Sequence, residues 1–363
     1  MKKILWCLVI LVVVVSFMVG GCGTPASAPQ PPSPTQPIQT PAPAPPAAKL
    51  TLKLGYDTPP TSFFGVASGW WAEEVTKRTG GRITIEVYPS STLVAQAKAL
   101  DYLRAGMADI YVVSVGTHAK SFPLSVADSL PGIGFPATAE GRALATSTFL
   151  SIINKYPAVA DEWKEFKILT YYSGDSIHLI TKDKEIHVPT DLKGVKIGSL
   201  GLRQNFMEVC GATPVMDIPP QAYEKLQTGI TQGTTVDWSA VLSYQLWEVA
   251  KYCTDVYLGG NGLPLTMGQE SWKKISASDQ KILLDVAVES QKPFAESLIK
   301  RAKDGRDKFL AAAGHSVIEP NAEELKQWQQ AYALLWDKWI SQQEAAGLKD
   351  ARAVLDEWKK VSK

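Results

Sequence analysis

Cysteine and histidine are scarce in this 363-residue chain, which has four of each. The histidines lack the HExxH spacing, the cysteines form no CxxC pair, and no GxSxG sequence marks a nucleophilic serine. The glycine pattern Gly132–Ala137 is a poor dinucleotide-binding loop, because Pro136 would obstruct the helix that must follow. We therefore expect no enzyme activity, no catalytic residue, no metal and no cofactor.

A surplus of positive charge is also absent. The chain has 37 basic and 36 acidic residues, and loss of Lys2 and Lys3 with an exported leader would leave 35 basic residues against 36 acidic ones. Without a basic surplus there is little to hold a phosphate backbone, so we expect no nucleic-acid partner. Apolar residues make up 45% of the chain, as in ordinary globular proteins.

The first 48 residues have the pattern of an export signal followed by a spacer. Lys2 and Lys3 precede an apolar run over 4–19, and the following Val-Gly-Gly-Cys resembles a lipobox ending at Cys22. We predict a lipoprotein signal peptide over 1–21 and acylation of Cys22, which would anchor the exported protein to membrane lipid of the bacterial envelope. An ordinary secretory signal or an uncleaved anchor helix is the alternative. Residues 23–48 carry no charge and are rich in proline and alanine, so 22–48 is predicted to be an extended tether.

Two cysteines remain in the part that follows the tether. Cys210 and Cys253 both lie in apolar surroundings, which favours buried free thiols. Export makes a disulfide between them the alternative.

The stretch 188–252 alternates between strand and helix patterns. It predicts a strand at 194–197, a helix at 202–210, a strand at 213–216 and a helix opened by Pro219. In α/β sheets, ligands bind where strand ends meet helix starts. One such junction carries Arg203, and a second carries the sequence from Gln232 to Trp238.

The rest of the chain predicts the same fold class. Residues 50–115 show a strand–helix–strand–helix–strand pattern, which implies a parallel sheet with right-handed crossovers. A capping-box spacing at 276–279 opens a helix that is predicted to run to about Ala312. Two amphipathic helices follow, and the first has a predicted core stripe of Leu325, Trp328, Tyr332, Leu335 and Trp339. About 315 residues exceed what one core usually supports, so two α/β lobes are expected.

Several segments resemble one family when they are taken in order. The clearest are DLKGVKI at 191–197, GATPV at 211–215, YEKLQTGITQG at 223–233 and WSAVLSYQLWEVAKY at 238–252. Weaker matches are RTGGRITIEVYPSSTL at 78–93, the segment 103–110 and SLPGIGFP at 129–136. Over roughly 50–340 the chain resembles the DctP-type solute-binding proteins of tripartite ATP-independent periplasmic (TRAP) transporters.

This resemblance implies an α/β, two-lobed periplasmic-binding-protein-like fold with a long bracing helix. It places lobe I at about 49–173 plus 255–275 and lobe II at about 174–254, with the helices of 276–363 bracing both. The implied function is an extracytoplasmic receptor that captures a small polar solute, such as an organic acid, and delivers it to the TRAP membrane permease subunits. The alternatives are a sensor or receptor for a different importer, or a cell-surface enzyme on this scaffold.

The resemblance also points to a binding site, with one departure. Family members typically have an arginine where this chain has Gly198, and that arginine grips the ligand carboxylate. An anionic ligand would then need another cation, for which Arg203 is the candidate, with a solvated surface arginine as the alternative. Trp238 could offer a flat face to the ligand or could belong to the core. The remaining candidate ligand-binding residues, which could equally have ordinary roles in loops, are Thr235, Tyr172, Ser176, Ser114 and Ser62.

Overall fold

The computed structural model of the protein describes residues 49–362. The predicted signal peptide, the tether and the acylation of Cys22 lie outside these residues and stay predictions. Between them the described residues form eleven strands, twelve α-helices and five short 3-10 turns.

Over 50–115 and 194–227 the strands and helices follow the order expected from the sequence. The strands are β1 Leu50–Gly55, β2 Ile83–Tyr88, β3 Ile110–Val112, β4 Phe166–Ser173, β5 His178–Thr181, β6 Lys196–Ser199, β7 Thr213–Met216, β8 Gly233–Val236, β9 Tyr252–Thr254, β10 Gly262–Gly268 and β11 Ser316–Ile318. The helices are α1 Phe63–Arg78, α2 Ala99–Arg104, α3 Ala139–Lys155, α4 Pro157–Glu162, α5 Leu202–Val209, α6 Pro219–Gln227, α7 Trp238–Ser243, α8 Gln269–Lys273, α9 Ala277–Glu289, α10 Gln291–Ala311, α11 Ala322–Ala345 and α12 Ala351–Val361.

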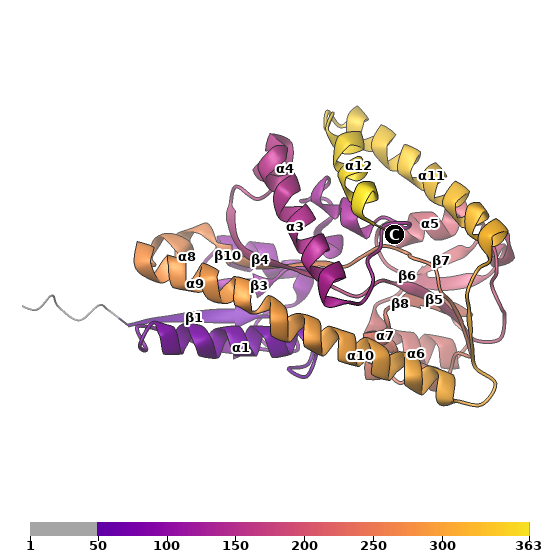
Figure 1. Cartoon of the computed structure of the whole chain (residues 1–363), viewed down its shortest axis with the longest axis horizontal. Helices are drawn as coiled ribbons and strands as arrows, with labels where there is room; N and C mark the ends of the chain where they lie inside the picture. The colour runs from indigo at the N-terminus through magenta and orange to yellow at the C-terminus, as the bar shows by residue number, and fades with distance from the viewer. Residues whose placement is uncertain (1–48, 363) are drawn as a thin grey trace, which may run out of the picture. The chain divides into compact units, whose positions relative to one another are not determined.

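Two sheets form the framework, one for each lobe (Figure 1). The first has the order β2-β1-β3-β10-β4, and the second has the order β11-β9-β5-β8-β6-β7. Strand β1 pairs in parallel with β2 and β3, as the pattern over 50–115 predicts. In the second sheet β6 pairs in parallel with β7 and β8, whereas β5 is antiparallel to β8 and β9. The predicted two-lobed α/β fold is confirmed, and the lobe boundaries stay a prediction.

The bracing helix of the prediction is two helices in line rather than one. α9 ends at Glu289 and α10 begins at Gln291, with Ser290 between them. Pro293 accounts for the break, because proline fits the first turn of a helix but in a helix interior it clashes with the carbonyl four residues before it. The Ser290 hydroxyl donates to Ala287 O at 2.7 Å and lies 2.6 Å from the Tyr172 hydroxyl, which fastens the junction to β4.

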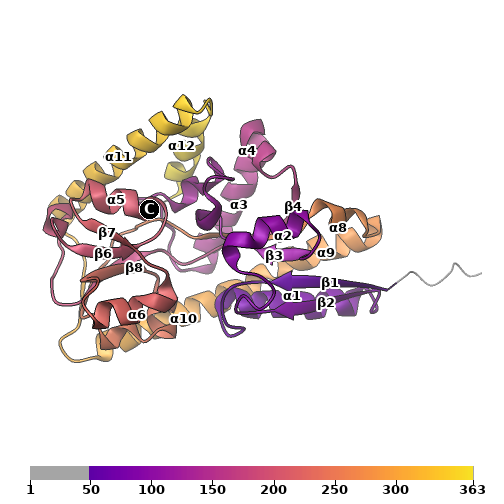
Figure 2. The same ribbon diagram turned by 180° about the vertical axis from the view of Figure 1, so that it is seen from behind.

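Helix α10 connects the two lobes. It packs on α1 beside the first sheet and on α7 beside the second, and both views show it extending past both (Figures 1 and 2). Near its start, Phe294 stacks on Tyr172 with ring centroids 4.7 Å apart. Near its end, Gly305 lies against α7 so closely that a Cβ there would stand 2.0 Å from Trp238 O. The helix is therefore packed tightly against both lobes.

The C-terminal helices lie on the opposite side of the sheets from α9 and α10 (Figure 1). α11 packs on α5, and α12 packs on α3. Four residues of the predicted α11 stripe are buried, but Leu325 is 40% exposed because it lies in the first turn of the helix, beyond its packed stretch. The remaining stripe is core, as predicted.

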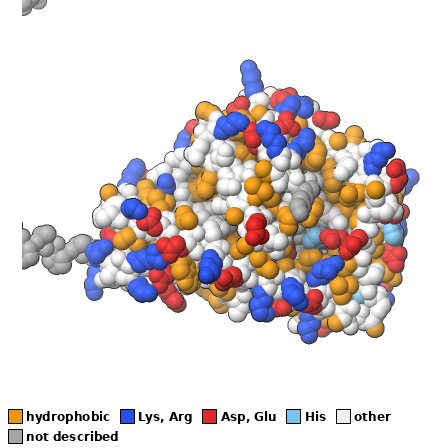
Figure 3. Space-filling view, in the orientation of Figure 1, with side chains coloured by type: hydrophobic (Ala, Val, Ile, Leu, Met, Phe, Trp, Pro, Cys, Tyr) orange, Lys and Arg blue, Asp and Glu red, His pale blue; other side chains and the backbone are white. Residues whose placement is uncertain are grey.

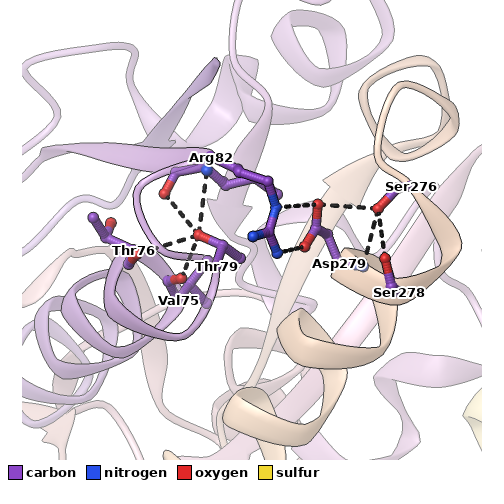
Figure 4. Close-up of polar contacts among 8 residues, drawn as sticks. Val75, Thr76, Thr79, Arg82, Ser276, Ser278 and Asp279 are labelled. Atoms are coloured by element: carbon purple, nitrogen blue, oxygen red, sulfur yellow. Dashed lines mark hydrogen bonds and ion pairs between the residues drawn. The ribbon is translucent and has the colours of Figure 1, made fainter. Parts of the chain in front are cut away.

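A polar cluster joins the turn after α1 to the start of α9 (Figure 4). Arg82 donates to both carboxylate oxygens of Asp279, with the shorter contact at 2.6 Å. Asp279 also receives a bond from Ser276, the N-cap residue that opens α9. Thr79 accepts the Ile83 N–H and donates to Val75 O. Each of these groups has a partner within the protein, which is typical of a structural cluster.

The two cysteines that follow the tether, Cys210 and Cys253, are free and buried, as the sequence favours. Lysine and arginine side chains are intermixed with aspartate and glutamate over the face shown in Figure 3, without a continuous patch of one sign. None of the helices within 49–362 is both long enough and apolar enough to cross a membrane.

Candidate functional site

Polar side chains gather at one edge of the second sheet, where β6 and β8 end. After β6 the chain turns through Gly201, whose φ of +61° favours glycine, and enters α5. After β8 it enters α7 directly, with Asp237 as the N-cap. Because β5 is antiparallel to β8 and pairs His178 with Val236, the start of β5 reaches the same edge. The residue pattern of two strand–helix junctions therefore brings Arg203, Asp237 and His178 into one region.

Arg203 lies in the first turn of α5 as a half-buried side chain. Its Nε is fully buried and has no hydrogen-bond partner among residues 49–362. Burial lowers the pKa of its guanidinium to about 10, while the carboxylates of Asp237 and Asp128 oppose that shift. A buried guanidinium donor without an acceptor is costly to the folded protein, and an anionic ligand would satisfy it.

Asp237 and Asp128 are the carboxylates that act on Arg203, and they come from different lobes. The Asp237 carboxylate accepts the Ala240 N–H at 2.6 Å, while burial and the neighbouring Asp175 raise its pKa to about 7. Asp128, in the turn that follows Leu124, accepts bonds from the Tyr171 and Ser129 hydroxyls. Burial raises the pKa of Asp128 to about 6, although these bonds and Arg203 favour its charged form.

Asp175 and His178 lie on the segment that leads from the first sheet into the second. Asp175 is 2% exposed; one carboxylate oxygen accepts the Ser176 N–H, and the other has no partner among the described residues. Burial raises the pKa of Asp175. His178 Nδ1 lies 3.1 Å from Asp255. Burial alone would lower the pKa of His178, but Asp255, Asp175 and Asp237 raise it overall. We call Asp128, Asp175, His178, Arg203 and Asp237 the charged cluster.

A second buried arginine, Arg142 of α3, lies beside the charged cluster. It is 2% exposed and donates to four backbone carbonyls, those of Phe135, Pro136, Ser173 and Gly174. These carbonyls belong to the segment before α3 and to the segment that leaves β4. Arg142 thus fastens the chain where it passes from the first sheet to the second.

Trp238 and Thr235 lie next to the charged cluster. Trp238 is 7% exposed and packs edge-on against Phe309 of α10, with its ring centroid also 5.6 Å from that of His178. The Thr235 hydroxyl donates to Gly198 O at 3.3 Å. Trp238 therefore belongs to an apolar core on one side and borders the charged cluster on the other.

The structure does not bring the other four predicted residues together around Arg203. Ser62 caps α1 by accepting the Gly65 N–H, and the Tyr172 hydroxyl bonds to Ser290 in the core of the first lobe. The Ser176 hydroxyl donates to Phe135 O at 3.0 Å, and Ser114 accepts a bond from the Thr117 hydroxyl at 3.2 Å. Each of these hydroxyls has a partner within the protein, and their contact with a ligand stays a prediction.

The backbone around Gly198 leaves no room for a side chain. A Cβ at Gly198 would lie 2.4 Å from Asp217 Oδ2 and 2.9 Å from Thr234 Oγ1. Asp217 is itself held by Thr234 at 3.1 Å and by Lys225 at 3.1 Å. A carboxylate therefore fills the space next to the position where the family resemblance leads one to expect an arginine.

The acidic members of the charged cluster were missed from the sequence. Asp237 directly follows β8, and Asp175 follows β4 by two residues, so both stand just after the end of a strand. A position just after a strand end could have identified both aspartates as candidates. From the sequence, we used this criterion only for hydroxyl, aromatic and arginine side chains. Nothing in the sequence around Asp128 marks it as a neighbour of Arg203.

A surface hollow between α1 and β2 lies away from these residues. Its lining includes Trp70, Lys77, Ile85 and Val87, and none of the predicted site residues. It holds no buried unpaired charge, whereas the charged cluster does. We therefore place the candidate site at the charged cluster.

Comparison with known proteins gives relatives along most of the chain. The C4-dicarboxylate-binding periplasmic protein DctP of Rhodobacter capsulatus is 24% identical over 299 residues, which is 80% of this chain and 87% of that protein. A TRAP periplasmic solute-binding protein from Desulfovibrio salexigens has a similar structure, with a TM-score of 0.75, 25% identity, and coverage of 86% of this chain and 96% of that one.

A marine metagenome TRAP solute-binding protein, solved with metahydroxyphenylacetate, also has a TM-score of 0.75. It is 23% identical, and the match covers 86% of this chain and 98% of that one. The family model described as DctP, bacterial extracellular solute-binding protein, family 7, matches residues 54–343. These matches confirm the resemblance noted in the sequence: the chain belongs to the DctP family of bacterial extracellular solute-binding proteins.

Proposed function

We propose that this protein is a non-enzymatic, extracytoplasmic receptor that captures a small organic acid between its two lobes and delivers it to a TRAP membrane permease. The observation that carries this proposal is the buried, unpaired Nε of Arg203 at a strand–helix junction. Two of the relatives named above bind C4-dicarboxylates and an aromatic acid respectively, which supports an acidic ligand.

The proposed mechanism uses the position of the charged cluster. Asp128 belongs to the first lobe, whereas Arg203 and Asp237 belong to the second, so a ligand bound to Arg203 would contact both. Closure of the lobes would remove water from the ligand and strengthen its charged contacts. The closed form would then present one surface to the permease.

Mass spectrometry of solute released from the purified, denatured protein tests the capture step. We expect a small molecule with a carboxylate. Uptake of that solute into vesicles that contain the permease, measured with and without the receptor, tests delivery. Capture without receptor-dependent uptake would favour a sensor or another importer.

We also propose that Cys22 carries a lipid anchor, because it follows a leader-length apolar run in a lipobox-like sequence. A Cys22→Ala variant should leave the membrane fraction and lose metabolic lipid label, while a Cys7→Ala variant keeps both. Label retained by the Cys22→Ala variant would contradict the anchor.

A further inference from the structure

The charged cluster and the groups around it contain side chains of both signs. Asp128, Asp175, Asp237 and the nearby Asp255 supply four carboxylates. Arg203, Arg142, His178 and Arg306, which acts on Asp255, supply the positive charges. A zwitterionic ligand would leave this balance of charge unchanged, whereas a dicarboxylate would add two negative charges.

Two of these cations, Arg142 and His178, are already engaged within the cluster. Arg142 donates to backbone carbonyls through both terminal nitrogens, and His178 pairs with Asp255 at 3.1 Å. In the charged cluster, the Arg203 side chain forms no hydrogen bond among the described residues, and its Nε is buried. The anionic part of a ligand is therefore directed to Arg203.

Asp175 is the matching feature of opposite sign. Asp175 is 2% exposed, and its Oδ2 has no hydrogen-bond partner of good geometry among residues 49–362, although the backbone N–H of Trp238 is near enough to favour the charged form of the carboxylate. An unpaired buried carboxylate oxygen is as costly as an unpaired guanidinium, and a ligand N–H donor or ammonium would satisfy it. The charges of both Asp175 and Arg203 act on Asp237, so Asp237 is near both unpaired groups.

From these two unpaired groups of opposite sign we infer that the solute carries a cationic nitrogen as well as a carboxylate, so that amino-acid-type zwitterions bind better than plain acids of the same shape. This inference rests on the proposed receptor function and narrows its substrate class. The carboxylate would bind Arg203, and the ammonium would bind Asp175 and Asp237. A zwitterion adds no net charge to the cluster.

Matched ligand pairs test the inference by calorimetric titration of the full folded domain. Phenylglycine differs from mandelate by an ammonium in place of a hydroxyl, and 4-aminobutyrate is close in length to succinate but has an ammonium in place of one carboxylate. For any pair of which a member binds, we expect the amino compound to have a Kd at least tenfold lower than that of the plain acid. Equal or tighter binding of the plain acid overturns the inference and leaves the proposed receptor function standing.

Variants then test whether the preference for amino compounds over plain acids depends on the charged cluster. Asp175→Asn should reduce the preference for the amino member to within threefold, and Asp237→Asn offers a second test because asparagine preserves the helix cap. Asp183→Asn, at an exposed residue, is the matched control and should leave the preference unchanged. An unchanged preference in both cluster variants, each folded by circular dichroism, would contradict the assignment.

If neither pair of ligands binds, the chemical identity of the solute released from the purified protein tests the inference instead. A released acid that contains a basic nitrogen upholds the inference, and a nitrogen-free acid overturns it alone. Release of no acid, together with binding of none, overturns both the inference and the proposed function.

Discussion

Arg142 and Arg203 lie in the same part of the molecule but use their hydrogen-bond donors differently. Arg142 is almost fully buried, and its two terminal nitrogens donate to four backbone carbonyls of the segments that connect the two lobes, although its Nε has no partner among the described residues. The Arg203 side chain forms no hydrogen bond among residues 49–362, its Nε is buried, and Asp237 and Asp128 act on it only through their charge. The comparison separates an arginine that holds the fold from one that is available to a ligand, although both are charged and both lie near the ends of strands.

The largest expected effect is on stability, at Arg142. Arg142→Met leaves several buried carbonyls without donors, so we expect the free energy of unfolding to fall by about 3–5 kcal/mol. Urea unfolding followed by circular dichroism measures this loss. Arg352→Ala, at an exposed residue of α12, is the control and should change stability by less than about 0.5 kcal/mol. A similar small change at Arg142 would show that its bonds to the carbonyls are dispensable.

The next effect is on affinity, at Arg203. If its guanidinium pairs with the ligand carboxylate, Arg203→Ala should lose about 1.5–3 kcal/mol of binding energy, which is roughly tenfold to a hundredfold in Kd. Its unfolding midpoint should stay within error of the wild type or rise, because a buried unpaired donor is removed. Calorimetric titration with the solute identified by mass spectrometry makes the measurement. Affinities within twofold would mean that Arg203 does not touch the ligand.

A smaller effect should appear in the dependence of stability on pH. The pKa of Asp237 is raised to about 7 in the folded protein, so the folded state binds more protons than the unfolded state between the two pKa values. Stability is therefore greatest at low pH within this window and is lost as the pH rises through 7. His178, whose folded pKa is also raised, changes stability in the same direction.

Asp237→Asn should flatten this dependence while preserving the cap of α7. Between pH 5 and pH 7.5 we expect the wild type to lose about 1–2 kcal/mol more than the variant. Urea titrations at four pH values in the absence of ligand make the comparison. Parallel pH profiles would show that Asp237 is ionised across the whole range in the folded protein.

The smallest effect on stability is expected at Arg82. Like Arg142, it has hydrogen-bond partners within the protein, but its side chain is 42% exposed. Its ion pair with Asp279 is screened by water, so Arg82→Ala should cost about 0.2–1 kcal/mol. The loss should shrink further in 1 M salt. A loss of more than about 2 kcal/mol in the free energy of unfolding would mean that water does not screen the ion pair of Figure 4.

The sequence predicts the elements of this fold better than its site. Strand β7 was predicted to the residue, and α5 to within one, because alternating and helical patterns are local properties. The junction within the bracing helices was missed, since Pro293 was not weighed against an otherwise continuous helical pattern.

The site depends on contacts between distant segments, which local patterns do not contain. Arg203 was found from its place at a strand–helix junction. The nearness of Asp128 to Arg203, 75 positions apart in the chain, follows only from the way the lobes meet. The sequence also could not reveal that the Ser62 hydroxyl caps α1 at Gly65 and that the Tyr172 hydroxyl bonds to Ser290, because these partners depend on the folded structure.

Helix α10 has a mechanical consequence for the proposed closure of the lobes. Phe294 fixes its first turns to β4, and Gly305 brings its later turns into backbone contact with α7. A rod held at two points transmits torque, so rotation of one lobe against the other would bend the helix or load the Ser290 junction. The elastic energy stored in this way would oppose closure and would assist opening. We expect this stored energy to favour reopening of the lobes. Reopening would help to release the solute once the permease weakens the contacts between the solute and the receptor.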